Sequence, residues 1–334
     1  MAKTTIIRGT SQYRSIVTVG FALLGLVVIL LPFVLSGFRT FQFTMALLWA
    51  LGVLSLNMLT GWSGQISLGH SALFGLGSYT TCILVGTYDW NPLLTIPVAA
   101  LVTFIFGIMI GIPALRLAGL YLALMTLAIG VAFTPVIRRF KEHTGGSMGI
   151  SIKKKVFPEE ILGLNLDQYL YFLVVIFAVV MFALARNLLK SRVGRAITAM
   201  RDNEIPAQTM GIHPARYKTL IFATSSMFAG IAGALYAFVI RFSAPYSFTL
   251  TLAIFFLAGL VVGGIGTLAG AVLGGLFIQF VPYYAEEINQ GLAGMVFGII
   301  IIIIMVSAPT GVLGLIKKLR ARVVTVTDPS VVRH

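Results

Sequence analysis

Charged residues are scarce in this sequence of 334 residues: they make up 10% of it, whereas 58% of the residues are hydrophobic. A soluble domain typically carries about 25% charged residues on its water-facing surface, so this composition excludes an ordinary soluble domain. Several apolar runs approach the roughly 20 residues that cross a ~30 Å hydrocarbon layer as a helix, and they do not alternate as barrel strands do. The sequence therefore predicts an all-α integral membrane protein.

The sequence also lacks the residues of several kinds of site. Cysteine occurs once, as Cys82 inside an apolar run, which excludes an intramolecular disulfide and a cysteine-based metal cluster. The four histidines fall in separate segments, so no metal site is expected. No P-loop, no nucleotide-binding glycine unit and no catalytic triad can be assembled. We therefore expect no catalytic residues and no bound cofactor on this chain; any ATP that drives it would bind another chain.

Apolar runs and their breaks predict about ten membrane spans. Their approximate bounds are 16–35, 41–60, 66–87, 93–112, 117–137, 169–187, 217–241, 250–264, 267–283 and 291–307. An N-terminal tail (1–15) and a C-terminal tail (309–334) then flank a transmembrane domain (16–308). The third span is the least regular, and whether residues 61–70 re-enter the membrane stays open. The eighth and ninth spans depend on dividing one long run at its glycines.

The basic residues are unevenly distributed over this topology. With both termini and the 188–216 loop on the cytoplasmic side, that side holds 16 of the 24 Lys and Arg residues and three of the ten acids. Lys and Arg favour the cytoplasmic side, so we expect both termini there. The loop 138–168, with six basic residues, then lies outside, which is the weakest point of this orientation. No basic domain is left over for nucleic acid, and membrane lipid is the expected surrounding.

No Asp or Glu lies within a predicted span. Ion-coupled carriers and proton pumps usually keep an intramembrane carboxylate because a buried charge is retained where it functions. The absence favours transport driven by another subunit, and a stand-alone ion-coupled carrier or an intramembrane enzyme is the less favoured alternative.

The cytoplasmic stretch Ser191–Lys218 is a polar island between two apolar spans. Asp202 and Asn203 are capping types, Pro206 suits a first helical turn, Gly211 suits a C-terminal cap and Pro214 stops continuation. The pattern predicts a short helix at about 205–210, a shape suited to docking another protein. An ordinary solvated loop is an equal alternative. The candidate docking residues are Arg195, Arg201, Asn203, Glu204, Pro206, Ala207 and Gly211, with Ile205 and Met210 as apolar contacts.

The stretch Asn57–Thr81 is a glycine-rich, polar entry into an apolar run. Broken backbone at membrane depth is tolerated where it is buried in protein or lines a cavity, so this segment is a candidate for the translocation path. Close helix packing explains it equally well. The candidate path residues are Asn57, Gly64, Gln65, Ser67, Gly69 and His70.

The run Leu257–Phe280 repeats glycine at four-residue spacing, first at Gly259 and Gly263 and then at Gly266, Gly270 and Gly274. Small residues one helical turn apart let helices approach closely. Helix packing is the favoured interpretation of this run.

These three segments, in this order, resemble the permease subunits of bacterial branched-chain amino-acid ABC importers over about Asn57–Gly314. The chain is more similar to the LivM type than to the LivH type because of RLAGLYLALMTLAIG, TGGSMGI and SRVGRAITAMRDNEIPAQTMGI. It departs from the permease pattern E-A-A-x-x-x-G: Glu204 stands three residues before Ala207, and Pro206 occupies one alanine position.

The resemblance implies a type II importer fold in the bacterial inner membrane. It implies as partners a second, LivH-type permease, two cytoplasmic ATPases and a periplasmic binding protein, with the 188–216 loop as the coupling loop seated on an ATPase. The substrate it implies is a branched-chain or related amino acid; urea, amides and aromatic carboxylates remain alternatives because relatives also move them.

Overall fold

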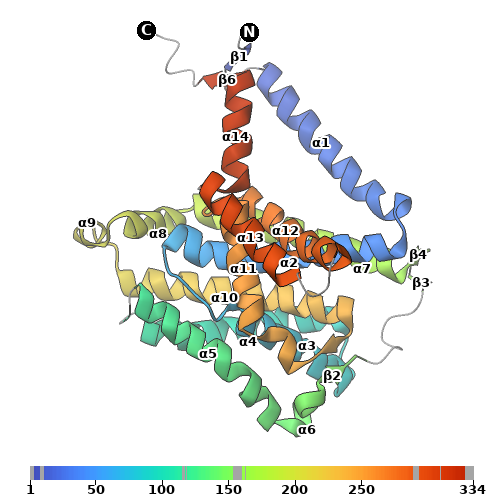
Figure 1. Ribbon diagram of the computed structural model, residues 1–334. Coiled ribbons are helices and arrows are strands. Elements are labelled where there is room, and N and C mark those ends of the chain that lie inside the picture. Colours follow the sequence, from blue (N-terminus) through green and yellow to red (C-terminus); the bar gives the residue numbers. More distant parts are fainter. Residues whose placement is uncertain are drawn as a thin grey trace.

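Helices form almost all of the architecture in the computed structural model, which describes residues 4–7, 11–114, 117, 119–152, 160–161, 163–288, 293–308 and 310–327 (Figure 1). The α-helices are α1 (Ser11–Val34), α2 (Gly37–Asn57), α3 (His70–Gly86), α4 (Pro92–Ala114), α5 (Leu120–Arg139), α6 (Lys141–Thr144), α7 (Leu166–Lys190), α8 (Arg192–Asp202), α9 (Glu204–Thr209), α10 (Pro214–Ile240), α11 (Leu250–Gly263), α12 (Leu268–Ile288), α13 (Ala293–Ser307) and α14 (Gly311–Val323). A π-helical turn, η1 (Met58–Trp62), prolongs α2, and two 3-10 turns are η2 (Gly146–Met148) and η4 (Pro245–Phe248).

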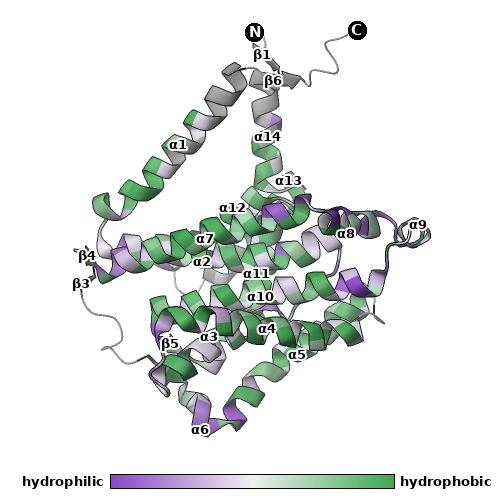
Figure 2. Cartoon of the chain, turned by 180° about the vertical axis from the view of Figure 1, so that it is seen from behind, coloured by the Kyte–Doolittle hydropathy of each residue, from purple (hydrophilic) through white to green (hydrophobic). Residues whose placement is uncertain are grey.

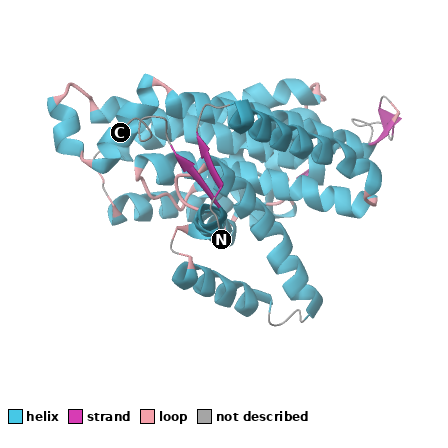
Figure 3. Ribbon diagram, turned by 90° about the horizontal axis from the view of Figure 1, so that it is seen from above, coloured by secondary structure: helices cyan, strands magenta, loops and turns pink. Residues whose placement is uncertain are grey.

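Six short strands form three two-stranded ladders. They are β1 (Thr4–Ile7), β2 (Ile150–Ser151), β3 (Glu160–Ile161), β4 (Leu164–Asn165), β5 (Phe242–Ser243) and β6 (Val324–Thr327). β2 pairs antiparallel with β5 and β3 with β4, so both ladders tie loops at one end of the bundle. β1 and β6 pair in parallel and join the far ends of α1 and α14, which stand away from the other helices (Figures 1 and 3).

The helices run between two ends of the bundle, which we name the α8–α9 end and the β2–β5 end. At the β2–β5 end α2 begins beside α7, where Gly37 approaches Asp167, and Arg39 donates to the Tyr284 hydroxyl of α12 (3.2 Å). At the α8–α9 end η1 meets the α11–α12 turn, and α14 begins against Gly264. The described part of the 138–168 loop lies at the end opposite α8 and α9.

Two helices form the centre of the bundle. In the most apolar 18-residue stretch of each helix, 78% of the residues are buried in α2 and 72% in α10. The corresponding share is 22–28% in α4, α5 and α7. The three outer helices instead expose large apolar side chains, such as Leu101, Leu124 and Ile176. An apolar side chain gains nothing from facing water, so these outer faces fit a hydrocarbon surrounding. Hydrophilic residues gather at α6, α8 and α9, close to the two ends (Figure 2).

Glycines bring α11 and α12 into backbone contact, as the sequence predicts. A Cβ on Gly263 would overlap the carbonyl oxygen of Gly270, and one on Gly274 would overlap that of Gly259. Gly266 departs from the predicted pattern: with φ +73° it forms the α11–α12 turn rather than a helix face. Its conformation is one that glycine adopts without steric cost.

Each of the ten predicted spans corresponds to a helix, but the helices differ in length. Six are long and apolar enough to cross a membrane: Gly37–Trp62, Pro92–Ala114, Leu120–Arg139, Leu166–Lys190, Pro214–Ile240 and Leu268–Glu287. Thr18–Val34, Leu250–Gly263 and Gly294–Ser307 are shorter apolar helices, and α3 has 17 residues. The all-α membrane fold is thus confirmed, with six candidate spans by length.

Besides the four-residue α6 in the 138–168 loop, two helices in the described part of the chain lie where the sequence predicts none. α8 occupies the first half of the 188–216 loop, and α14 occupies part of the predicted C-terminal tail. Both are amphipathic and polar rather than uniformly apolar, which is why a search for membrane spans passes over them.

Candidate functional site

Residues 64–69 leave helical geometry and run from the α8–α9 end into the interior of the bundle. The predicted third span therefore begins as a helix at His70, four residues later than its predicted start. His70 contacts Ser225, which follows the first residue of α10, Pro214, by 11 positions, a rise of roughly 16 Å. α3 thus starts deep within the bundle, after a break in the helical backbone.

Hydrogen bonds satisfy the backbone of this non-helical stretch. The Gln65 amide donates to the Leu59 carbonyl (3.2 Å), and the Leu68 amide donates to the Thr126 hydroxyl of α5 (3.0 Å). The Gly69 amide reaches the Ser67 hydroxyl (3.4 Å). An unpaired amide in a membrane interior costs several kcal/mol, so these bonds allow an extended segment to persist there.

His70 is the centre of a buried polar cluster. Its Nδ1 lies 3.0 Å from the Ser67 hydroxyl and its Nε2 lies 2.8 Å from the Ser225 hydroxyl. The Ser225 hydroxyl donates to the Ser55 carbonyl of α2 (2.6 Å), so its oxygen accepts from Nε2–H of the imidazole. The Ser67 hydroxyl then donates to Nδ1. A neutral His70 therefore joins α3, α10 and α2 with both ring nitrogens used.

Asn57 clamps the end of α2 to the α11–α12 turn. Its Nδ2 donates to the Thr267 carbonyl (2.8 Å), and its Oδ1 accepts from the Gly266 amide (2.8 Å). The side chain is fully buried. Gly61 lies against the same turn, where a Cβ would overlap Asn57 Oδ1.

The two remaining path candidates lie next to the turn that leaves η1. Gly64 has φ +72°, a conformation suited to glycine, and is exposed. Gln65 is buried, and its Nε2 donates to the Ser63 hydroxyl (2.6 Å). The six path candidates thus lie along one continuous segment, and five of them are buried. Whether they line the path in another conformation stays a prediction.

A small cavity borders the segment. It has a volume of about 10 Å³ and is lined by Ser67, Gly69, Leu73, Ile110, Thr126, Ile129 and Phe222. That is room for about one water molecule. This cavity is therefore too small to hold an amino acid in this conformation.

The predicted docking helix is present as α9, within one residue of its predicted bounds. Asn203 is its N-cap in extended conformation, and Pro206 lies in its first turn. At its C-terminus the Ile212 amide donates to the Ala207 carbonyl (3.1 Å), and Gly211 follows with φ +84°. α9 is thus a short helix between α8 and α10 that is capped at its C-terminus, while the Asn203 side chain makes no capping hydrogen bond.

Some side chains of the docking candidates pack against the helix bundle, and others are exposed on the side away from it. Ala207 is 4% exposed and packs into the core, whereas Ile205 and Met210 are 75% and 82% exposed. Glu204 accepts two hydrogen bonds from Lys218 Nζ of α10, both 2.8 Å long. The Glu204–Lys218 pair therefore fixes α9 to the bundle while the two apolar side chains remain uncovered.

The chain matches the family model described as branched-chain amino acid transport system / permease component over residues 39–305. It belongs to this family. It is 30% identical over 304 residues to the high-affinity branched-chain amino acid transport system permease protein LivM of Salmonella typhimurium, covering 84% of this chain and 71% of the relative. It is 25% identical over 298 residues to LivH of the same organism, covering 81% and 92%. No solved structure matches.

The recognition made from the sequence is thereby confirmed, including the greater similarity to LivM. The matched range starts in α2 and ends in α13, so it contains the non-helical segment and α8–α9. As a member of this family, the chain is a transport permease component.

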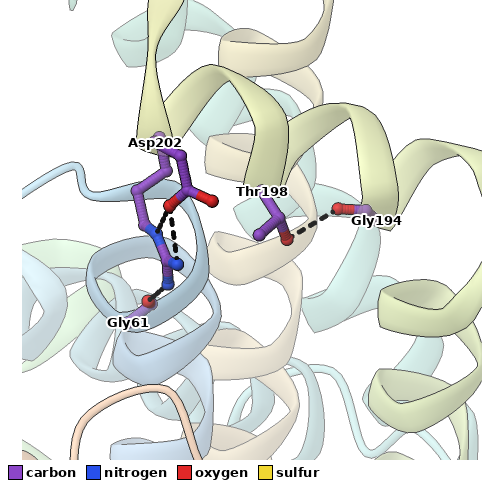
Figure 4. Close-up of polar contacts among 5 residues, drawn as sticks. Gly61, Gly194, Thr198 and Asp202 are labelled. Atoms are coloured by element: carbon purple, nitrogen blue, oxygen red, sulfur yellow. Dashed lines mark hydrogen bonds and ion pairs between the residues drawn. The ribbon is translucent and has the colours of Figure 1, made fainter.

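Arg201, at the end of α8, joins the two segments of the permease. Its Nη1 donates to the Gly61 carbonyl (3.0 Å), and its Nε and Nη2 donate to Asp202 Oδ1 (3.0 and 2.8 Å). Figure 4 shows Gly61 and Asp202 bonded to the same guanidinium, while Thr198 bonds to Gly194 within α8. The sequence predicts Arg201 as a docking residue; its bond to η1 could not be predicted, because the two residues are 140 positions apart.

Reasoning from the sequence missed several residues that hold the segment in place, Thr126 and Ser225 through their hydroxyls and Thr267 through its backbone carbonyl. Thr126, Ser225 and Thr267 lie in or beside apolar helices, where single Ser and Thr residues usually bond to their own helix. Their spacing carries no signal that would separate them from the others.

Proposed function

We propose that this chain is the transmembrane permease subunit of an ATP-driven importer and forms half of the translocation path for branched-chain or related amino acids. Family membership and the names of the relatives support the substrate class. The observation that carries the coupling role is α9, a capped turn that presents Ile205 and Met210 at the end of a buried bundle.

The acids of the chain agree with an external energy source. Asp167, Glu286 and Glu287 lie in terminal turns of α7 and α12, and Asp202 and Glu204 lie in α8 and α9. No Asp or Glu lies in the middle of any apolar helix in the described part of the chain. A branched-chain amino acid such as leucine is a zwitterion without net charge, so a neutral path accommodates it, and ATP hydrolysis would occur on two separate cytoplasmic ATPase subunits.

The remaining partners and the orientation belong to the same proposal. LivM and LivH are distinct relatives in one organism, which favours a LivH-type chain as the second permease, and a periplasmic binding protein would deliver the substrate. We place the α8–α9 end and both termini in the cytoplasm of the inner membrane, with about ten helices crossing it. Thiol labelling tests this: Ser147→Cys should react from outside and Gln208→Cys only from inside, and the reverse pattern would contradict the orientation.

Uptake by the complete complex tests the function. In proteoliposomes that contain both permeases, the ATPases and the binding protein, ATP should drive leucine uptake, and deletion of Pro206–Gly211 should abolish uptake and ATPase co-purification while the chain stays membrane-inserted. Unimpaired uptake by the deletion variant would contradict the coupling role. Uptake of urea, an amide or an aromatic carboxylate without leucine would contradict the substrate class.

A further inference from the structure

Arg201 connects α8 with η1, two parts of the chain that lie 140 positions apart in the sequence. Its bond to the Gly61 carbonyl runs from α8 to η1, the π-helical end of α2. The other side-chain hydrogen bonds of α8 and its N-cap Ser191 stay local: Ser191 with Leu188, Arg195 with Lys190 and Thr198 with Gly194. The guanidinium of Arg201 therefore reaches from the docking region into the membrane bundle.

The group that Arg201 holds is itself part of a rigid junction. Gly61 packs against Gly266, and Asn57 ties the same turn through two hydrogen bonds. The aliphatic stem of Arg201 also lies against Gly64, since a Cβ there would be 3.0 Å from Arg201 Cγ. A displacement of Arg201 would thus move η1 through Gly61 and the start of the non-helical segment through Gly64.

The π-helical geometry of η1 suits a junction that changes its backbone position when Arg201 moves. π-helical turns are rare and often occur at functional sites, because a strained turn can change register at low cost. η1 is followed directly by the extended stretch that leads to His70. A shift of the Gly61 carbonyl would change where that stretch enters the bundle.

The salt bridge to Asp202 fixes the direction of the guanidinium. Two of its nitrogens bind one carboxylate oxygen, and the third nitrogen points to Gly61. A planar fork directs two nitrogens to the carboxylate and a third to the carbonyl, whereas a lysine ammonium offers all its donors from one nitrogen. The arrangement is therefore specific for arginine.

We infer that Arg201 is the positioning residue that transmits movement of α8–α9 to the Gly61–His70 segment. The inference rests on the proposed function, because it needs a partner that moves α9. When an ATPase displaces Ile205 and Met210, α8 moves with them, and Arg201 pulls the carbonyl at the end of α2. The non-helical segment opens or closes accordingly.

Substitution of Arg201 should uncouple ATP hydrolysis from uptake. In the reconstituted complex we expect Arg201→Gln to keep ATP hydrolysis within about twofold of wild type and to lower uptake at least tenfold, so that more ATP is hydrolysed per molecule imported. Arg201→Lys should fall between the two. Arg192→Gln removes the same charge from an exposed position of α8 and should match wild type.

Each result of this experiment has a defined meaning. Wild-type uptake by Arg201→Gln overturns the inference, and so does a parallel loss of hydrolysis and uptake, which indicates failed assembly. Absence of ATP-driven uptake by the wild-type complex instead overturns the proposed function, so the two failures are distinguishable.

A disulfide tests whether the contact itself transmits the movement. A Cβ on Gly64 would lie 3.9 Å from Cβ of Arg201, within the range of about 3.5–4.5 Å for a disulfide. The native Cys82 is fully buried and should not interfere. We expect the Gly64→Cys/Arg201→Cys variant to be uncoupled when reduced and to recover uptake when oxidised, because the covalent bond replaces the guanidinium contact.

The single variant Gly64→Cys controls for the strain of a side chain at φ +72° and should not respond to oxidation. A disulfide that forms without restoring uptake overturns the inference. Failure of the pair to cross-link contradicts the contact on which it rests.

Discussion

The non-helical segment and the α8–α9 region differ in how far their side chains are buried and paired within the chain. His70, in the first, is 1% exposed and has both ring nitrogens bonded within the chain, whereas Ile205 and Met210, in the second, are 75% and 82% exposed. A buried polar group is stabilised when it is paired, and an exposed apolar group when it is covered. The polar groups of the first region are therefore paired within this chain, whereas the second leaves two apolar side chains uncovered.

The largest effect should come from Asn57→Leu. Leucine has a similar volume but leaves the Gly266 amide and the Thr267 carbonyl without their partner. Unpaired groups of this kind cost about 1–3 kcal/mol each when buried, so we expect a loss of about 2–4 kcal/mol in the free energy of unfolding. Unfolding of the purified chain in mixed micelles measures it. Asn187→Leu, at an exposed position of α7, should change stability by less than about 0.5 kcal/mol.

Two adjacent serines give a closely matched second test. Ser225 and Ser226 are both fully buried, but Ser225 bridges His70 and Ser55, whereas Ser226 bonds to the Phe222 carbonyl of its own helix. Ser225→Ala should cost about 1–3 kcal/mol because His70 Nε2–H loses its acceptor. Ser226→Ala should be nearly neutral, since a helix carbonyl keeps its backbone partner. Equal losses in the same unfolding assay would show that the cluster around His70 is not what holds the segment.

The two serines also show where reasoning from the sequence ends. Long apolar runs predicted the ten helices because a hydrocarbon surrounding demands both length and apolarity. Proline, glycine and asparagine predicted α9 because each has a specific place in a helix cap. The His70–Ser225 bond could not be predicted, since it joins residues 155 positions apart and either serine fits the pattern.

α8 is a different kind of omission, because its signal is present in the sequence. Ala196, Ile197 and Met200 are buried and recur at helical spacing on one face. The region was interpreted as a loop because its charges suggested solvent exposure. Amphipathic periodicity, applied to polar segments as well as apolar ones, predicts this helix.

The exposed region should respond to loss of apolar surface rather than to loss of internal bonds. Ile205→Asp should leave the free energy of unfolding unchanged, because the side chain is 75% exposed. Burial of an Ile side chain contributes about 1.5–3 kcal/mol, so ATPase binding should weaken about tenfold or more, as measured by titration of the ATPase onto the permease pair. Asn187→Asp adds the same charge on exposed α7 and should bind normally. Reduced stability with unchanged binding would reverse the assignment of this region.

The smallest effect should come from the pair that fixes α9 to α10. Glu204 and Lys218 form an ion pair 2.8 Å long with 42% and 22% of their side chains exposed, and exposed pairs contribute about 0.2–1 kcal/mol. Glu204→Lys should therefore lower stability by no more than about 1 kcal/mol, yet lower uptake severalfold, because α9 loses its anchor. Lys218→Glu added to Glu204→Lys restores opposite charges and should restore uptake. If the exchanged pair remains as impaired as Glu204→Lys alone, the Glu204 carboxylate is needed by the partner, and the anchor lies elsewhere in α9.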